Sequence, residues 1–406
     1  MNIRSITVFV APGWPVEPRR FEESALCLVA ARRALEQAGY PVQTLRLATP
    51  PPGELERPVP PADRAEFARQ LEAQAFVHGI DYVAIGPALP EEPGGFAAIP
   101  EILAATENVF TSGLYAHAEI GVALPAARAC AEVIERNSHL PSDGFANLRF
   151  AALANVASGT PFFPAAYHDS GSPALAIATE AAELAVDAFR EVSSPEIARR
   201  RLVGMIEAHA SAITRLMQPI GVEHETRWLG IDFSLAPYPE HHRSLGTALE
   251  SLGVPAVGLA GTIAAAAFLA DCLDRAQFKR TGFCGLFLPV LEDATLAARA
   301  GEGRLTIDDL LVLSTLCGTG LDTLPVPGDT PVEALMAILV DLGALALRHN
   351  KPLTARIMPL PGKAAGDPVH FDFPYFADSR VLDVPPDAVT GLLGGAGVLH
   401  IGPRAA

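Results

Sequence analysis

The sequence predicts an α/β protein, and three observations support this fold class. Half of the 406 residues are apolar and 19% are charged, which provides for a large core and excludes a disordered or fibrous chain. Short, continuous apolar runs alternate along the chain with longer segments of helical period. The short runs contain few polar positions, which is typical of strands that helices cover on both faces.

The first part of the chain alternates regularly between the two patterns. We predict strands at residues 3–10, 42–47, 82–85, 109–115 and 148–156, and helices at residues 22–39, 62–76, 100–107 and 123–136. Gly39 ends the first helix as a C-cap, because glycine adopts the left-handed conformation there without strain. Residues 50–61 form a loop, since their prolines fit neither a helix interior nor a central strand.

The middle of the chain is predicted to be helical, over residues 173–192 and 195–217, with a proline near the start of each helix. The second half resumes the alternation, with strands at 256–259, 282–288 and 354–358 and helices at 262–274, 307–317 and 331–349. No fixed-period repeat and no clear linker occur. We therefore expect one large α/β domain over residues 1–406, with a looser part at 1–105 and a helical middle at 172–220; two domains are the alternative.

Charge and cysteine content restrict the partners and the compartment. The 30 basic and 46 acidic residues give a net charge of −16, which argues against a nucleic-acid or anionic-membrane partner. Five cysteines without C-x-x-C spacing indicate reduced thiols. The first residues lack the core of a signal peptide, and glycines interrupt the longest apolar stretch. We expect a cytoplasmic protein that binds a small molecule and, because its helices are so apolar, forms a homo-oligomer.

Sites in α/β proteins collect at the carboxyl ends of strands, where this sequence has several polar, glycine-rich turns. Cys317 is the candidate nucleophile, because Gly318 and Gly320 let the backbone bend sharply beside it. A thiolate needs a positive or dipolar neighbour to be reactive. The alternative for Cys317 is a buried, inert thiol, since free cysteines are often fully buried.

Acidic residues in the same turns are candidates for acid–base catalysis. Glu292 and Asp293 are adjacent, and Asp322 is a third candidate. Clustered carboxylates raise one another's pKa and can divide the acid and base roles between them, or they can bind a divalent cation. The alternative is helix capping, which is strongest for Asp329, ahead of the helix that opens at Pro331.

Further polar residues are candidates for substrate binding. They are Asp232, Ser234, His168, Thr262, Asp329, Thr330, Arg356 and Lys363. The turn at Thr262 points backbone N–H groups toward a possible anion, although a simple helix cap explains it as well. An aspartate in the apolar run around Asp232 must have a partner if it is buried. No cofactor motif, zinc-hydrolase pattern or nucleophile elbow occurs, so no resident cofactor is predicted, with a divalent metal as the open alternative.

Several motifs, in order, resemble the domain-of-unknown-function family 711, the UPF0210-type proteins. They are Asn147–Phe150, Phe162–His168, Gly230–Pro237, Gly320–Asp322 and Pro327–Pro331, within a match from about Thr106 to Lys363. The resemblance implies a fold like that of pyruvate formate-lyase, a ten-stranded α/β barrel with an inner loop, surrounded by helices.

In the glycyl radical enzymes of that fold, a cysteine on the inner loop carries the chemistry, and Cys317 looks like the thiol at the comparable position. Their R-V-x-G-aromatic signature is missing from the last residues, 394–400, so the resemblance implies no glycyl radical.

Two main functions remain. The first is an enzyme that acts on a small polar metabolite in the barrel cavity, with thiol or carboxylate acid–base chemistry by Cys317, Asp322, Glu292 or Asp293. The second is a non-catalytic binding or regulatory protein for a small carboxylate or amino acid. A metal-dependent hydrolase or lyase is a weaker alternative.

Overall fold

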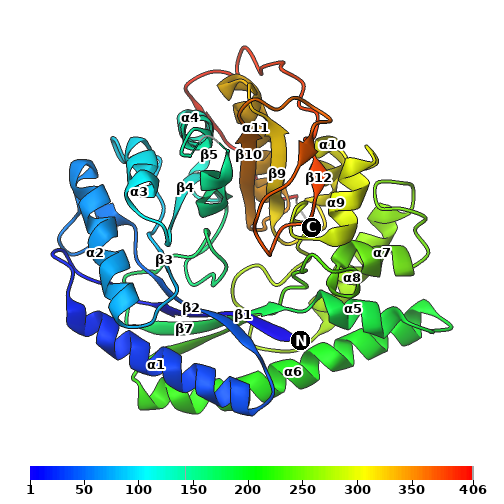
Figure 1. Ribbon diagram of the computed structural model, residues 1–406, viewed down its shortest axis with the longest axis horizontal. Coiled ribbons are helices and arrows are strands. Elements are labelled where there is room, and N and C mark those ends of the chain that lie inside the picture. The colour runs from blue at the N-terminus through cyan, green and yellow to red at the C-terminus, as the bar shows by residue number, and fades with distance from the viewer. Residues whose placement is uncertain (142, 405–406) are drawn as a thin grey trace.

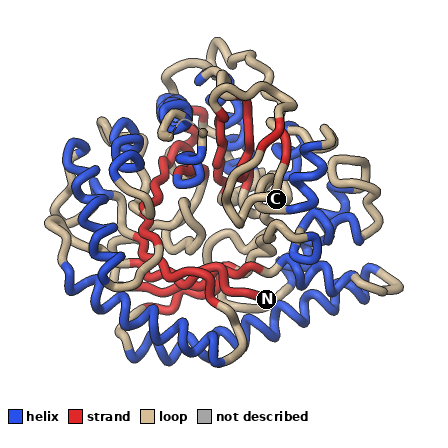
Figure 2. Tube along the Cα trace, viewed as in Figure 1, coloured by secondary structure: helices blue, strands red, loops and turns tan. Residues whose placement is uncertain are grey.

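A computed structural model describes residues 1–141 and 143–404 of the chain. Its centre is a large sheet surrounded by helices (Figures 1 and 2). The main path of the sheet runs β8-β7-β1-β2-β3-β4-β6-β10-β9, and β5 and β13 extend it beside β4. Its strands are β1 (Asn2–Phe9), β2 (Val42–Ala48), β3 (Tyr82–Ala84), β4 (Val109–His117), β5 (Gly121–Ala123), β6 (Phe150–Ala154), β7 (Ala174–Glu180), β8 (Arg227–Asp232), β9 (Gly320–Pro327), β10 (Leu353–Leu360) and β13 (Val398–Leu399). The short β11 (Pro368–Val369) and β12 (Ser379–Arg380) pair separately.

The sheet is mixed but mostly parallel. Strands β1, β2, β3, β4 and β6 are parallel to one another. The direction changes between β1 and β7 and between β6 and β10, while β7 is parallel to β8 and β10 to β9. The predicted α/β class is therefore confirmed.

Helices cover the outside of the sheet. They are α1 (Pro18–Gln37), α2 (Arg64–Val77), α3 (Ile99–Ala105), α4 (Leu124–Ser138), α5 (Ala182–Phe189), α6 (Pro195–Glu223), α7 (Leu245–Ser251), α8 (Thr262–Arg275), α9 (Ala294–Gly301), α10 (Ile307–Leu313) and α11 (Val332–Arg348). In Figure 1, α1 and α6 run below β1, β2 and β7, and α4 and α11 lie behind β4 and β10. No helix in the described ranges is long and apolar enough to cross a membrane.

The segment between α8 and α9 connects β8 and β9, the strands at the two ends of the main path of the sheet. Ile231 at the end of β8 forms a parallel bridge with Arg280, and Leu235 forms one with Leu286. Pro289 then bridges Asp322 of β9, again in parallel. Residues 280–289 therefore follow β8 at one end and β9 at the other, although they form no regular strand.

The prediction of one helix over residues 173–192 is wrong, because β7 occupies the first part and α5 the second. The sequence of β7 is Ala-Leu-Ala-Ile-Ala-Thr-Glu, and every residue of it is buried. A short, wholly apolar run fits a buried helix and a buried strand equally well, so periodicity does not separate them. Pairing with β1 and β8 decides in favour of the strand.

Three other predictions differ from the structure. The predicted strand at residues 282–288 is not a regular strand, and this segment reaches β8 and β9 only through isolated bridges. Residues 256–259 form turns rather than a strand. The polar, glycine-rich segment from Gly320 is predicted to be a turn, but it is the start of β9. Gly320 has φ +91°, so its conformation is indeed one of a turn, and yet it pairs with Thr354 of β10.

Candidate functional site

A cavity of about 400 Å³ is lined by residues from strands that are far apart in the order of the sheet. Side chains of β1, β2, β3, β4 and β6 line one part of it, and side chains of β9 and β10 another. The lining also includes residues within the ranges 106–108, 145–149, 162–165, 236–237 and 283–289, together with Glu292, Thr319, Phe373 and Tyr375. This volume is within the usual range for small-molecule sites, about 300–1,000 Å³.

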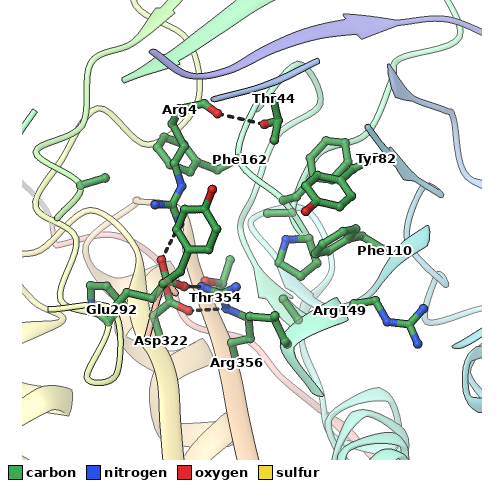
Figure 3. Close-up of a pocket in the computed structure, with 18 of the residues that line it drawn as sticks. Arg4, Thr44, Tyr82, Phe110, Arg149, Phe162, Glu292, Asp322, Thr354 and Arg356 are labelled. Carbon is green, nitrogen blue, oxygen red and sulfur yellow. Dashed lines mark hydrogen bonds and ion pairs between the residues drawn. The ribbon is translucent and has the colours of Figure 1, made fainter. Parts of the chain in front are cut away.

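A chain of ion pairs crosses the wall of this cavity (Figure 3). Arg356 of β10 donates from Nε to Asp322 Oδ1 at 2.5 Å and from Nη2 to Glu292 Oε1 at 2.7 Å. The other oxygen of Glu292 accepts from Arg4 of β1. Arg4 also pairs with Glu180 at the end of β7, so the network joins both outer parts of the sheet.

Irregularities in the strands position these side chains. Arg4 lies at a register shift between β1 and β7, where Ile3 pairs with Thr179 and Ser5 with Ala178. Arg356 lies opposite an extra residue in β9, next to Thr323 with its left-handed φ of +45°. Bulges of this kind re-aim side chains and are common next to active sites.

Burial and charge act in opposite directions on the two carboxylates. Burial raises the pKa of Glu292, but the guanidinium groups of Arg4 and Arg356 outweigh it and hold the pKa below its ordinary value. Burial also raises the pKa of Asp322; Arg356 opposes this effect, but the negative charge of Glu292 adds to it, and the pKa stays raised. Asp322 is therefore the carboxyl group of this pair that takes up a proton more readily.

Two further arginines line the cavity in different ways. Arg149 donates to the backbone oxygens of residues 103, 106 and 109, and its guanidinium is turned away from the ion pairs (Figure 3). Arg46 of β2 donates one hydrogen bond, from Nε to Thr44 Oγ1 at 2.8 Å. Its guanidinium lies 4.9 Å from the ring centre of Phe163 and 5.7 Å from that of Tyr82. Burial and the nearby charge of Arg4 lower the pKa of Arg46 to about 9.

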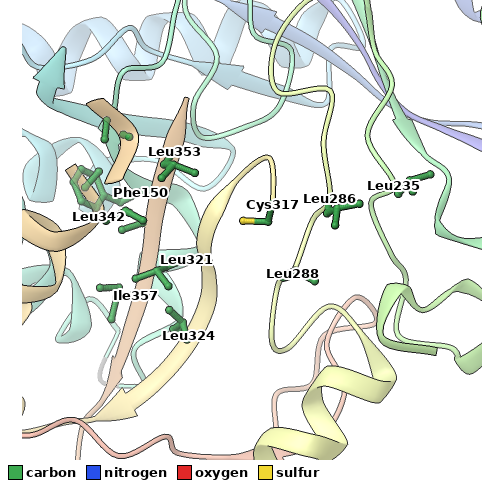
Figure 4. Close-up of a cluster of buried hydrophobic side chains, with 14 of the residues drawn as sticks. Phe150, Leu235, Leu286, Leu288, Cys317, Leu321, Leu324, Leu342, Leu353 and Ile357 are labelled. Atoms are coloured by element: carbon green, nitrogen blue, oxygen red, sulfur yellow. The ribbon is translucent and has the colours of Figure 1, made fainter. Parts of the chain in front are cut away.

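The structure brings together three of the residues that the sequence singled out, Glu292, Asp322 and Arg356, and all three line the cavity. Cys317 does not line it. This thiol is 1% exposed and lies in the apolar core beside Leu286 and Leu321 (Figure 4). Its Sγ accepts the backbone N–H of Gly320 at 3.3 Å.

Asp293, the neighbour of Glu292, also lies away from the cavity lining. Its carboxylate accepts the backbone N–H groups of Thr295 and Leu296 and so caps α9. It also accepts the hydroxyl of Ser244 at 2.6 Å and the N–H groups of Leu245 and Gly246 at the start of α7. The contacts of Asp293 are therefore those of a helix cap, as the alternative interpretation expects.

Asp232 and Ser234 lie at the end of β8, where they hold the segment that crosses to β9. Asp232 accepts the Ser234 hydroxyl at 2.6 Å and the backbone N–H groups of Phe283 and Cys284 at 2.7 and 2.8 Å. Ser234 in turn accepts the N–H of Gly285. Burial raises the pKa of Asp232 to about 6, although these hydrogen bonds oppose the shift.

This raised pKa predicts a pH dependence of stability. Asp232 binds its proton more tightly in the folded chain, so its stabilising contribution is present below the ordinary pKa of 3.8 and is lost as the pH rises through about 6. We expect the free energy of unfolding of the wild type, minus that of Asp232→Asn, to fall by about 2 kcal/mol between pH 4 and pH 7. Urea unfolding of both proteins at each pH measures this difference; a difference that stays constant or grows with pH contradicts it.

The other predicted binding residues lie outside the cavity lining. His168 is buried, and its ring contacts Gly171 O and Asp169. Thr262 closes a turn at the start of α8 by donating to Leu259 O. The remaining three belong to the turns after β9 and β10: Asp329 is exposed, Thr330 donates to Pro327 O, and Lys363 donates to Pro368 O.

Sequence reasoning missed Arg4 and Arg46. Both are lone charged residues inside apolar strands, and a buried charge in such a run needs a partner or a ligand. That argument identified Asp232 and was not applied to the two arginines. The expectation that site residues lie at the carboxyl ends of strands also fails here. Several lining residues lie in the first halves of their strands: Arg4, Thr44, Tyr82 and Phe110.

The described part of the chain contains no group of three or more His, Cys, Asp or Glu side chains arranged to hold a metal ion. The cavity wall presents instead a row of alternating arginines and carboxylates. Such a wall can orient a charged small molecule and exchange a proton with it.

Comparison with known proteins identifies relatives of this chain. The model of a family described as "Uncharacterised ACR (DUF711)" matches residues 1–374, so the match includes the N-terminal third as well. A UPF0210 protein of Pyrobaculum islandicum is 33% identical over 366 residues, which cover 83% of this chain and 78% of the relative. UPF0210 proteins of Oleidesulfovibrio alaskensis and Methanosarcina mazei are each 31% identical, over 86% and 82% of this chain and 81% and 77% of their own lengths. The chain therefore belongs to the uncharacterised DUF711 family.

Proposed function

We propose that this protein is an enzyme that acts on a small polar metabolite in the cavity, with Asp322 as the group that transfers a proton. The observation that carries this proposal is the state of the Asp322 carboxylate. Its Oδ1 is bound to Arg356, and its Oδ2 has no hydrogen-bond partner in the described part of the chain. Both oxygens of Glu292, in contrast, are held by arginines.

A general acid or base needs a free oxygen within reach of the substrate and a pKa near the working pH. Asp322 lines the cavity, and its pKa is raised above the ordinary value of an aspartate, chiefly by burial. Perturbed carboxyl groups in a cavity are frequent at functional sites. Arg356 and Glu292 act as positioning residues, because Arg356 holds Asp322 Oδ1 and Glu292 holds Arg356.

Carboxylate chemistry fits this site better than thiol chemistry. Cys317 is buried in the apolar core and does not line the cavity. Its Sγ already accepts a backbone N–H, and the ammonium of the neighbouring Lys351 donates to the Cys317 carbonyl oxygen. The proposed mechanism therefore uses neither a thiolate nor a radical.

We propose also that the sheet closes into a ten-stranded barrel, with residues 280–289 as the tenth strand. The parallel bridges of this segment to β8 and β9 support closure. Residues 161–166 then form the inner loop, since Ser5 and Thr7 of β1 both donate to Pro161 O and Phe163 reaches the cavity lining. The cavity is the space inside the barrel. A crystal structure in which residues 280–289 lie away from β8 or β9 would contradict closure.

Turnover of a metabolite mixture tests the proposed enzyme. Pools of small organic acids, amino acids and their amides are incubated with the wild type and with Asp322→Asn, and followed by NMR. We expect the wild type to convert at least one compound, and the variant to be slower by about a hundredfold or more. An asparagine keeps the shape and the Arg356 contact, and melting temperature shows whether the variant folds.

The outcome also separates the enzyme from a binding protein. A compound that raises the melting temperature but is never converted would contradict catalysis and support binding alone. Equal turnover by the wild type and Asp322→Asn would remove Asp322 from the mechanism.

A further inference from the structure

We propose that the molecule bound in this cavity carries a single carboxylate on a flat, apolar body, and that Arg46 binds the carboxylate. This inference rests on the proposed use of the cavity as a substrate site and names the class of its substrate.

The first argument is charge balance. Arg46 lines the cavity together with Arg4 and Arg356, and those two arginines pair with the buried carboxylates of Glu180, Glu292 and Asp322. Arg46 forms no ion pair with any described residue, so its positive charge has no paired counter-charge in the described part of the chain. One negative charge on a ligand would neutralise it.

The second argument is unused hydrogen-bonding capacity. A guanidinium has five N–H donors, and Arg46 uses only Nε–H, toward Thr44. Arg46 is 8% exposed, so bulk water reaches it poorly. Thr319 Oγ1, on another wall of the same cavity, is buried and has no partner within the described residues. Buried polar groups without partners are rare, and the Thr319 hydroxyl together with the unused N–H donors of Arg46 in the same cavity points to a polar ligand.

The third argument is the shape and chemistry of the remaining wall. Phenylalanines 110, 162, 163, 283 and 287 line the cavity together with Tyr82. Phe110 packs edge-on against both Tyr82 and Phe163, at ring distances of 5.2 and 5.4 Å, so the rings next to Arg46 hold one another in place. A flat apolar group is the natural partner of such a wall.

The unpaired Arg46 also indicates which class of anion the cavity binds. A carboxylate brings one negative charge and two oxygens, which match the planar fork of one guanidinium. A phosphate monoester brings close to two charges at neutral pH. Its second charge would have no free cation beside Arg46, because Arg4 and Arg356 already pair with carboxylates and the Arg149 guanidinium is turned away and donates to backbone oxygens. We therefore infer a carboxylate rather than a phosphate.

Calorimetric titration with simple probes tests this. The probes are benzoate, phenylacetate and cinnamate, with the matching amides and phenyl phosphate as comparisons. At least one carboxylate should bind the wild type at least tenfold more tightly than its amide and than phenyl phosphate. Tighter binding of phenyl phosphate would overturn the choice of carboxylate, and binding of none of the three carboxylates would overturn the proposal.

Two variants identify Arg46 as the binding group. Arg46→Met should weaken carboxylate binding at least tenfold and leave amide binding nearly unchanged, while Arg46→Lys should fall between them. Without ligand, Arg46→Met should melt at the same temperature as the wild type or higher, because it removes a buried charge that has no partner. Unchanged carboxylate binding in this folded variant would overturn the proposal.

The result is separable from that of the proposed function. Asp322→Asn should still bind the carboxylate probe, because the proton-transferring residue is not the anion-binding one. If probe binding depends on Arg46 but no compound is turned over, the proposed ligand class is supported and the proposed enzymatic function is contradicted. If a neutral compound is turned over and Arg46→Met does not slow its turnover, the proposed ligand class is contradicted and the proposed enzymatic function is supported.

Discussion

Replacing Arg356 with methionine should destabilise the fold by about 3–5 kcal/mol. Arg356 is the only described partner of the Asp322 carboxylate and one of two partners of Glu292. Methionine fills much of the same volume and cannot neutralise either group. Two buried carboxylates then lose a counter-charge at once, and an unpaired buried charge costs far more than a surface ion pair contributes.

Urea unfolding at pH 7 measures this effect, and two controls sharpen it. Arg19 pairs with Glu23 on the exposed face of α1, so Arg19→Met should change stability by less than about 1 kcal/mol. Adding Asp322→Asn and Glu292→Gln to Arg356→Met should recover part of the loss, because no unpaired carboxylate then remains. A loss as small as that of the Arg19 variant would mean that water compensates the carboxylates and that the network is not buried in solution.

Replacing Asp293 with alanine should cost about 4 kcal/mol, because this one carboxylate serves the starts of two helices. Four backbone N–H groups and the Ser244 hydroxyl lose their acceptor together. The site is fully buried, so water does not easily replace the missing oxygens. The loss should therefore exceed that of an ordinary helix cap, which is about 1 kcal/mol.

Asp309 provides the matched control. Its carboxylate completes the capping box of α10 through solvent-exposed hydrogen bonds, and Asp309→Ala should cost about 1 kcal/mol or less. Thermal and urea unfolding of both variants give the comparison. If Asp293→Ala is as stable as the wild type but turns over no substrate, then Asp293 has a chemical role and the capping interpretation is wrong.

The sequence predicted the fold class and most of the elements. A strand such as β2 or a helix such as α11 shows its type in the local pattern of apolar residues, because each buries a face whose period is set by its own geometry. The pattern also placed Glu292, Asp322 and Arg356 on the list of candidates, and their motifs pointed to the family. Where local patterns are ambiguous, as in β7, only the neighbouring strands decided.

The tertiary structure alone decided which polar residues share a site. Asp232, Asp293 and Asp322 look alike in sequence, since each lies at or beside an apolar run. Asp232 and Asp293 have their oxygens occupied by backbone N–H groups and serines, whereas Asp322 faces a cavity with one oxygen free. The sequence shows that a charge is buried among apolar residues, but not which groups stand within 3 Å of it. Its hydration, its pKa and its partner are set by distances between segments far apart in the chain, and so only the folded structure separates the charge that holds the fold together from the one that is free for a ligand.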